Sequence, residues 1–175
     1  MEFRIVHLPP FRAASSGVDK EIDFSDAGIL GKFNAYFSGI RPEARDDFMP
    51  RDFLFFDDQE GGLVWWWALS EGMDDGGYGI ADFDGGSYLT YTFRDGDEET
   101  NGIRYREALK YIENSGIFEF DARPGHYAMG HIITPREIID AQGWSQMEVF
   151  MPIKLKQGVG EQNGATAPSA QEERI

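Results

Sequence analysis

Residues 146–154 alternate between two kinds of side chain, the pattern of a β-strand with two different faces. One face is wholly apolar and suits a cover of helices; it consists of Met147, Val149, Met151 and Ile153. The other face places Glu148 beside the aromatic ring of Phe150. On an open face Glu148 would be an ordinary solvated acid. In a cleft it would be a desolvated anion in need of a cation, or an acid/base group.

Two stretches carry apolar residues at the three- and four-residue spacing of an amphipathic helix. The first begins at Ser25, which suits an N-cap, and ends at Gly39. The second spans residues 101–115. A capping-box pattern over residues 134–137, with proline at the first helical position, predicts a short third helix that ends at Gly143.

Short apolar or alternating runs between turn sequences predict the remaining strands. They cover residues 2–18, with a kink at Pro9-Pro10, and residues 52–57, 63–69, 80–83, 87–94 and 118–122. The run over 63–69 contains Trp65, Trp66 and Trp67. Because neighbouring residues of a strand face opposite ways, at least one tryptophan must face away from the other two.

The order strand, helix, strand, strand occurs twice along the chain. The matching pairs of strands are 11–17 with 87–94, 53–58 with 118–123, and 63–69 with 147–153. Each half alone would leave its strands uncovered, so the halves should share one sheet around a pseudo-twofold axis. We predict an α+β fold of duplicated βαββ halves, with an antiparallel sheet, two long helices on one face and a central ligand cleft. The repeat places Trp66 opposite Phe150, makes their strands meet near the axis, and puts both rings with Glu148 on the cleft floor.

Composition narrows the functional class. The net charge of −15 at pH 7 repels phosphate backbones, so we expect no direct nucleic-acid binding, and it would concentrate cations near a cleft. The absence of cysteine excludes disulfides and thiolate metal sites. The N-terminal sequence does not resemble a signal peptide, and no stretch approaches the roughly 20 apolar residues that cross a bilayer. We therefore expect a cytoplasmic protein without membrane contact.

Residues 157–175 are rich in Gly, Ala, Gln and Glu, so we predict a disordered C-terminal tail after one domain that spans residues 1–156. The three histidines lack a metal-ligand spacing, and no lysine follows Gly85-Gly86 as a phosphate loop would require. We therefore expect no metal and no cofactor.

These motifs together resemble the GyrI-like small-molecule-binding domain, the SHS2-like effector-binding domain of AraC- and MerR-type multidrug regulators. The matching stretches are residues 5–11, the turn at 85–88, and 148–153, in which glutamate, an aromatic residue and proline follow at the family's spacing. The resemblance covers about residues 1–156, although the family usually has tyrosine at the position of Phe150. Because Met1 begins almost at the first strand, we expect a stand-alone form without a helix-turn-helix.

The resemblance implies a bacterial protein whose central cleft binds flat, lipophilic, often cationic molecules, in transcription regulation or in protection against drugs and toxins. Glu148 would be the anionic anchor, and the aromatic walls would be Phe150, Trp66, Tyr127 and Tyr91. An alternative is a hydrolase of electrophilic small molecules that uses Glu148 as general base. A third hypothesis is an interaction domain that regulates a protein partner through its acidic surface.

Overall fold

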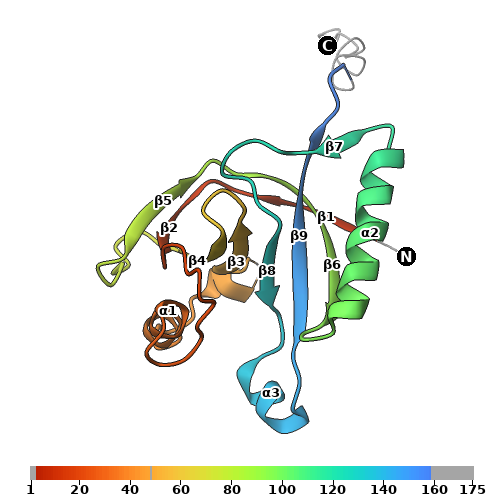
Figure 1. Cartoon of the computed structure of the whole chain (residues 1–175). Coiled ribbons are helices and arrows are strands. Elements are labelled where there is room, and N and C mark those ends of the chain that lie inside the picture. Colours follow the sequence, from red (N-terminus) through yellow and green to blue (C-terminus); the bar gives the residue numbers. More distant parts are fainter. Residues whose placement is uncertain (1–2, 48, 159–175) are drawn as a thin grey trace, which may run out of the picture.

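One antiparallel sheet, curled into a half-barrel, forms the centre of the molecule, as seen in the computed structural model of residues 3–47 and 49–158 (Figure 1). Its strands are β1 (Arg4–Leu8), β2 (Phe11–Ser15), β3 (Asp52–Asp57), β4 (Gly62–Ala68), β5 (Gly79–Phe83), β6 (Gly86–Arg94), β7 (Phe118–Phe120), β8 (Met129–Ile132) and β9 (Gln146–Leu155). The helices are α1 (Ile29–Phe37), α2 (Glu98–Asn114) and α3 (Arg136–Gln142), with the 3₁₀ helix η1 (Ala44–Asp47). None of the described helices is long and apolar enough to cross a membrane. Apart from residues 157 and 158, the predicted tail lies outside the described residues.

The order of the strands shows the predicted duplication. It runs β1-β6-β9-β8-β3-β4-β2-β5, with β7 paired to β9. The triplet β6-β9-β8 and the triplet β3-β4-β2 are related by reversal, so two βαββ halves, β2-α1-β3-β4 and β6-α2-β8-β9, meet between β3 and β8. There Leu54 pairs with Gly130 and Phe55 with Met129. The α+β class, the antiparallel sheet and the pseudo-twofold relation are thus confirmed.

One strand assignment of the repeat is wrong. The counterpart of β3 is β8 and not the predicted strand at 118–122, which forms only the short β7 at the side of β9. The sequence pattern did not predict β8 because four residues that include a glycine give too short a signal. As a result, β3 and β8 lie between β4 and β9, and the strands of Trp66 and Glu148 do not meet at the axis.

A shared bend curls the sheet. The expected single kinked strand over residues 2–18 is two strands: β1 lies at the edge of the sheet beside β6 of the second half, and β2 belongs to the first half. The pairs Leu8–Gly86 and Phe11–Phe83 continue one ladder on either side of the bend, where Pro9-Pro10 faces Asp84-Gly85. Proline cannot donate to a ladder, so the break in pairing falls at this point.

The bend requires a glycine at position 85. Its φ is +83°, and a Cβ there would lie 2.9 Å from the Leu8 carbonyl oxygen. Gly96 also has a positive φ, +81°, but open space around it. We expect Gly85→Ala to destabilise the protein by at least about 1 kcal/mol more than Gly96→Ala, because both pay the left-handed backbone cost and only the first adds a clash. Urea unfolding of both variants measures the difference, and equal losses would contradict the close approach.

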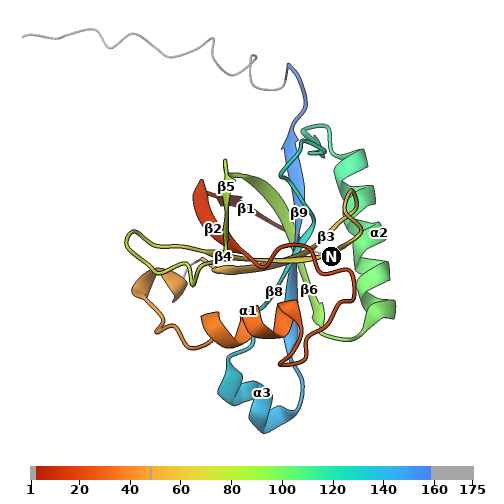
Figure 2. The same cartoon turned by 60° about the vertical axis from the view of Figure 1, so that its left-hand side comes forward.

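Both long helices cover one face of the sheet, as predicted (Figure 2). In β9 the predicted apolar face packs with Ala108 and Ile112 of α2. In β4 Trp65 and Trp67 pack with α1, whereas Trp66 faces the other way. The register connects the two helix-covered regions, because Trp65, Leu54, Gly130, Val149 and Tyr91 lie opposite one another across five adjacent strands. Residues opposite each other in antiparallel strands share a face.

The first helix begins later than predicted. Asp23 accepts a hydrogen bond from the backbone N–H of Ser25 at 2.8 Å, which places Ser25 in a turn and not at an N-cap. Helix α1 starts at Ile29, with Gly28 as its N-cap residue. A side-chain turn of this kind competes with helical hydrogen bonding, which explains the delay.

The second helix begins earlier than predicted because the carboxylate of Asp97 accepts the N–H of Thr100 at 3.0 Å. The capping box of the third helix is wrong. Thr134 accepts the N–H of Gln146 at 2.7 Å instead, and thereby joins the start of β9 to the segment before α3. Gly143 ends α3 with φ of +77°, as expected of a left-handed terminal residue.

Candidate functional site

The inner face of the curled sheet is filled by aromatic rings. Trp66 and Phe150 are 7% and 3% exposed, and Tyr127 packs against the same cluster. The ring of Phe55 stacks on Tyr127 with 4.2 Å between centroids, and Trp66 meets Tyr127 edge-on at 6.0 Å. The structure therefore brings together three of the side chains predicted to wall a cleft, but as parts of a packed core. Burial in this cluster raises the pKa of Tyr127 above its usual range.

Tyr91 is not part of this group. It lies on the helix-covered face of β6, in the cluster that includes Ala108 and Ile112 of α2, and its hydroxyl donates a hydrogen bond to Asn101 at 3.0 Å. Desolvation raises the pKa of this hydroxyl well above its ordinary value. The alternation of β6 therefore separates Tyr91 from Glu148, and we do not include it in the site.

Glu148 occupies the margin of the inner face. In the register it lies between Thr92 on β6 and His131 on β8, and its side chain is only 11% exposed. Its Oε1 accepts a charge-assisted hydrogen bond from Nη2 of Arg4, which reaches across from the edge strand β1 and is 64% exposed. The chain therefore supplies its own cation to the glutamate, a partner that the sequence pattern did not indicate.

A pocket of about 450 Å³ opens beside Glu148, at one end of the sheet. Its apolar lining includes Ile40 after α1, Met49 before β3, Trp67 on β4, and Ile132 and Ile133 at the end of β8 and just after it. The ring of Trp67 stacks on Phe37, with 5.2 Å between centroids, and this contact restricts its orientation. The pocket thus combines a nearly buried carboxylate with a lining that is in part apolar and aromatic.

Several polar residues of this pocket lie close to oppositely charged groups, and Arg41 also lines it. Nδ1 of His131 lies 2.7 Å from a carboxylate oxygen of Asp52. Arg51, 4% exposed, contacts Asp46 at 2.6 Å and Glu43 at 2.9 Å, and it also donates to the carbonyl oxygen of Ala68. The pairing of Arg51 fixes the segment that carries η1, which forms one side of the pocket.

The sequence pattern did not indicate Trp67, Asp52 and His131 as lining residues. The alternation of the tryptophan strand puts Trp67 on the helix face, and it lines the pocket because the pocket opens at the end of the sheet, next to the end of α1. The position of His131 beside Glu148 follows from the pairing of residues 129–132 with β9, a strand that the sequence pattern did not predict. No group of three metal-binding side chains occurs within the described part of the chain.

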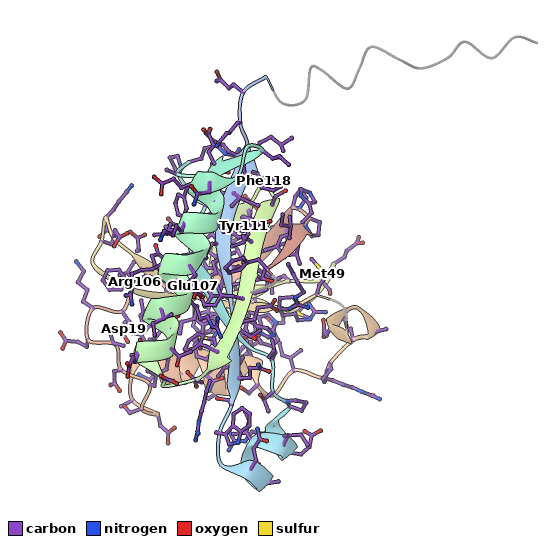
Figure 3. All side chains as sticks on the ribbon, turned by 90° about the vertical axis from the view of Figure 1, so that its right-hand side faces the viewer. Asp19, Met49, Arg106, Glu107, Tyr111 and Phe118 are labelled. Carbon is purple, nitrogen blue, oxygen red and sulfur yellow. The ribbon has the colours of Figure 1, made fainter. Side chains whose placement is uncertain are left out.

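A second hollow lies on the other side of the molecule. Figure 3 looks onto α2 and shows Glu107 and Tyr111 on this helix near Phe118 of β7, with Met49 of the first pocket away from the helix. This groove has a volume of about 630 Å³ and contains none of the predicted site residues. Size alone does not identify a binding site, so the candidate is the pocket that combines Glu148 with an aromatic wall.

A polar cluster around the buried side chains of Asp121 and His126 anchors the chain between β7 and β8. His126 lies 3.0 Å from Asp84 and 3.7 Å from Asp121, while Arg123 contacts Asp121 at 2.7 Å. The hydrogen bonds from Arg123 hold the pKa of Asp121 below its usual range, although burial opposes that shift. Burial, together with Asp121 and Asp84, raises the pKa of nearby Tyr88 well above its ordinary value. The cluster positions the segment that places Tyr127 on the inner face.

Comparison with known proteins places the fold but not the family. No protein-family description and no curated sequence matches this chain. Among solved structures, SAV2435 bound to tetraphenylphosphonium is similar with a TM-score of 0.54 and 11% identity, over 88% of this chain and 94% of that one. A Staphylococcus aureus MU50 protein named for bacterial transcription regulation has a TM-score of 0.49 and 12% identity, over 88% and 99%. The integron cassette protein VCH_CASS2 of Vibrio cholerae has a TM-score of 0.37 and 10% identity, over 87% and 95%.

Proposed function

We propose that this chain contains a ligand-binding domain of the GyrI-like kind, and that it binds lipophilic organic cations in the pocket beside Glu148. Sensing or sequestering such a compound would serve transcription regulation or protection against a toxic molecule. The proposal moves the binding position from the middle of the inner face, where the aromatic rings are packed, to the pocket at the end of the sheet.

The observation that carries the proposal is the position of Glu148. Its side chain is 11% exposed and borders a pocket that has apolar and aromatic residues as well as polar ones in its lining. A ligand that combines a diffuse positive charge with apolar surface satisfies both features at once, because it interacts with the anion and leaves water together. The face of Trp67 adds a cation–π partner, which contributes roughly 0.5–2 kcal/mol to the binding free energy of such a ligand.

Two further observations support a cationic ligand. The net charge of −15 raises the concentration of cations around the molecule. The fold is shared with SAV2435, whose structure contains the lipophilic cation tetraphenylphosphonium. At 11% identity this likeness concerns the fold, so the role of Glu148 rests on its burial and surroundings.

The first test replaces Glu148. We expect the wild type to bind tetraphenylphosphonium, and Glu148→Gln to weaken that binding at least about tenfold, or about 1.4 kcal/mol. The substitution keeps the shape, removes the anion and leaves Arg4 without its partner. Binding of the neutral triphenylphosphine oxide should change less than about twofold, since it depends on apolar contact alone. Isothermal titration calorimetry measures both ligands.

The matched control is Glu119→Gln. This acid also lies on a strand paired with β9, but it is half-exposed, pairs with Lys154 at 3.3 Å, and lies outside the pocket. Glu119→Gln removes the same unit of negative charge as Glu148→Gln, so its effect on cation affinity measures the general electrostatic contribution. Equal affinity of wild type and Glu148→Gln for every lipophilic cation tested would show that Glu148 has only a structural role.

One observation favours a second candidate function, the hydrolysis of an electrophilic small molecule. A histidine close to a carboxylate is a candidate general base, and Nδ1 of His131 lies 2.7 Å from Asp52, beside Glu148. In this function Glu148 or His131 would activate water. Recovery of the ligand distinguishes the two functions, since binding returns it intact and hydrolysis yields product that mass spectrometry detects.

A further inference from the structure

We propose that Arg4 competes with cationic ligands for Glu148 and thereby sets the affinity threshold of the site, an inference that rests on the proposed function. A small hydrophilic cation offers only its charge, so replacing Arg4 at the carboxylate would yield little net free energy of binding. A lipophilic cation adds the burial of its apolar surface, so it binds in spite of the competition. Arg4 is in this sense a specificity-determining residue, although it does not line the pocket.

The geometry of the pair carries the inference. Glu148 is the buried member, at 11% exposure, and Arg4 is the exposed member, at 64%. Displacement of Arg4 from the carboxylate returns its guanidinium to water and needs no desolvation of that group, and the attraction that is lost is partly screened because the side chain is already exposed. The glutamate cannot follow it and stays at the pocket with its charge uncompensated.

The position of Arg4 in the sheet also favours competition. It lies on the edge strand β1, where its register partner is Thr90 on β6, and its side chain crosses β6 to reach Glu148 on β9. The pocket approaches the same carboxylate from β8, on the opposite side of β9. One carboxylate thus lies between a cation of the chain and the place where we expect a cation of the ligand.

The change in cation affinity caused by Arg4→Gln has one sign if Arg4 competes with the ligand and the opposite sign if Arg4 only positions Glu148. If Arg4 competes, its removal raises the affinity for tetraphenylphosphonium about three- to tenfold and leaves the neutral triphenylphosphine oxide unchanged. If Arg4 only positions Glu148, its removal lowers the affinity for the cation. Arg4→Lys keeps the charge and should stay within about twofold of the wild type.

Two matched controls sharpen the test. Arg12→Gln removes a guanidinium of similar exposure, 68%, from β2, where it lies 3.8 Å from Asp82, and should leave the affinity unchanged. In the Glu148→Gln background, Arg4→Gln should change the affinity less than about twofold, because the charge of an exposed side chain is screened. Binding to Arg4→Gln should also depend more steeply on salt than binding to the wild type, since the anion is then uncompensated.

The experiment is calorimetric titration of the full chain and these variants with tetraphenylphosphonium and triphenylphosphine oxide at two salt concentrations. An increase in cation affinity in Arg4→Gln that is absent in the double variant supports the inference. Cation binding that is unchanged or weaker in Arg4→Gln overturns it and leaves the proposed function standing. Failure of every variant to bind tetraphenylphosphonium overturns both.

Discussion

Replacing Trp66 by alanine should lower the free energy of unfolding by about 3–5 kcal/mol, the range for a large aromatic side chain removed from a core. Trp66 is 7% exposed and touches Phe55, Phe83 and Tyr127 within the inner cluster. These rings come from β3, β5 and the segment before β8, so the cavity would open where the curl of the sheet brings them together. Urea unfolding at neutral pH measures the loss.

The matched control is Phe56→Ala. Phe56 lies on β3, the strand that pairs with β4, but is 47% exposed, so its removal should change the stability within about 0.5 kcal/mol. A loss below about 1.5 kcal/mol for Trp66→Ala would mean that the inner face is not a packed core. In that case Trp66 would again be a candidate for the wall of a binding cleft.

The sequence predicted the duplicated fold because its signals are periodic and repeated. The alternation around Glu148 and the helical spacing of the two long helices each identify an element and its buried face. Local hydrogen bonds were less visible, and the boundaries of the helices were affected most. Asp23 and Thr134 each use a side chain in a way that the pattern does not reveal.

The site was harder to predict because it depends on which strands are neighbours. The short strand β8 has almost no periodic signal, yet it separates β4 from β9 and places His131 beside Glu148. Arg4 is 144 residues away from Glu148 in sequence, and only the position of β1 next to β6 brings them together. Alternation gives the face of a residue, but the order of the strands decides its partners.

That difference changes the interpretation of Glu148. Alternation alone indicated an anion on an aromatic face, for which a cationic ligand was the expected partner. The structure shows an anion that already has a cation of the chain on one side and a pocket on the other. The affinity for a charged ligand then depends on the difference between two ion pairs, so apolar contact with the pocket becomes the larger part of selection.

The second large effect concerns the buried cluster between β7 and β8. Asp121 is 1% exposed and accepts hydrogen bonds from Arg123 at 2.7–3.0 Å. We expect Asp121→Asn to destabilise the protein by about 1.5–3 kcal/mol at pH 7, the usual contribution of hydrogen bonds to charged groups. It also removes a negative charge 3.7 Å from Nδ1 of His126. Glu119→Asn, at a half-exposed position on β7, should cost much less.

The effect should depend on pH with a definite sign. Because the pKa of Asp121 in the folded protein lies below its ordinary value of 3.8, its stabilising contribution is fully present above that value. The contribution is lost as the pH falls through the lowered folded pKa. Urea unfolding of wild type and Asp121→Asn from pH 7 to about pH 3 should therefore give a constant difference in stability down to about pH 4, and a shrinking one below. A difference that stays constant throughout would show that Asp121 contributes by shape and neutral hydrogen bonding, and that its charge adds nothing to the anchoring of the Tyr127 segment.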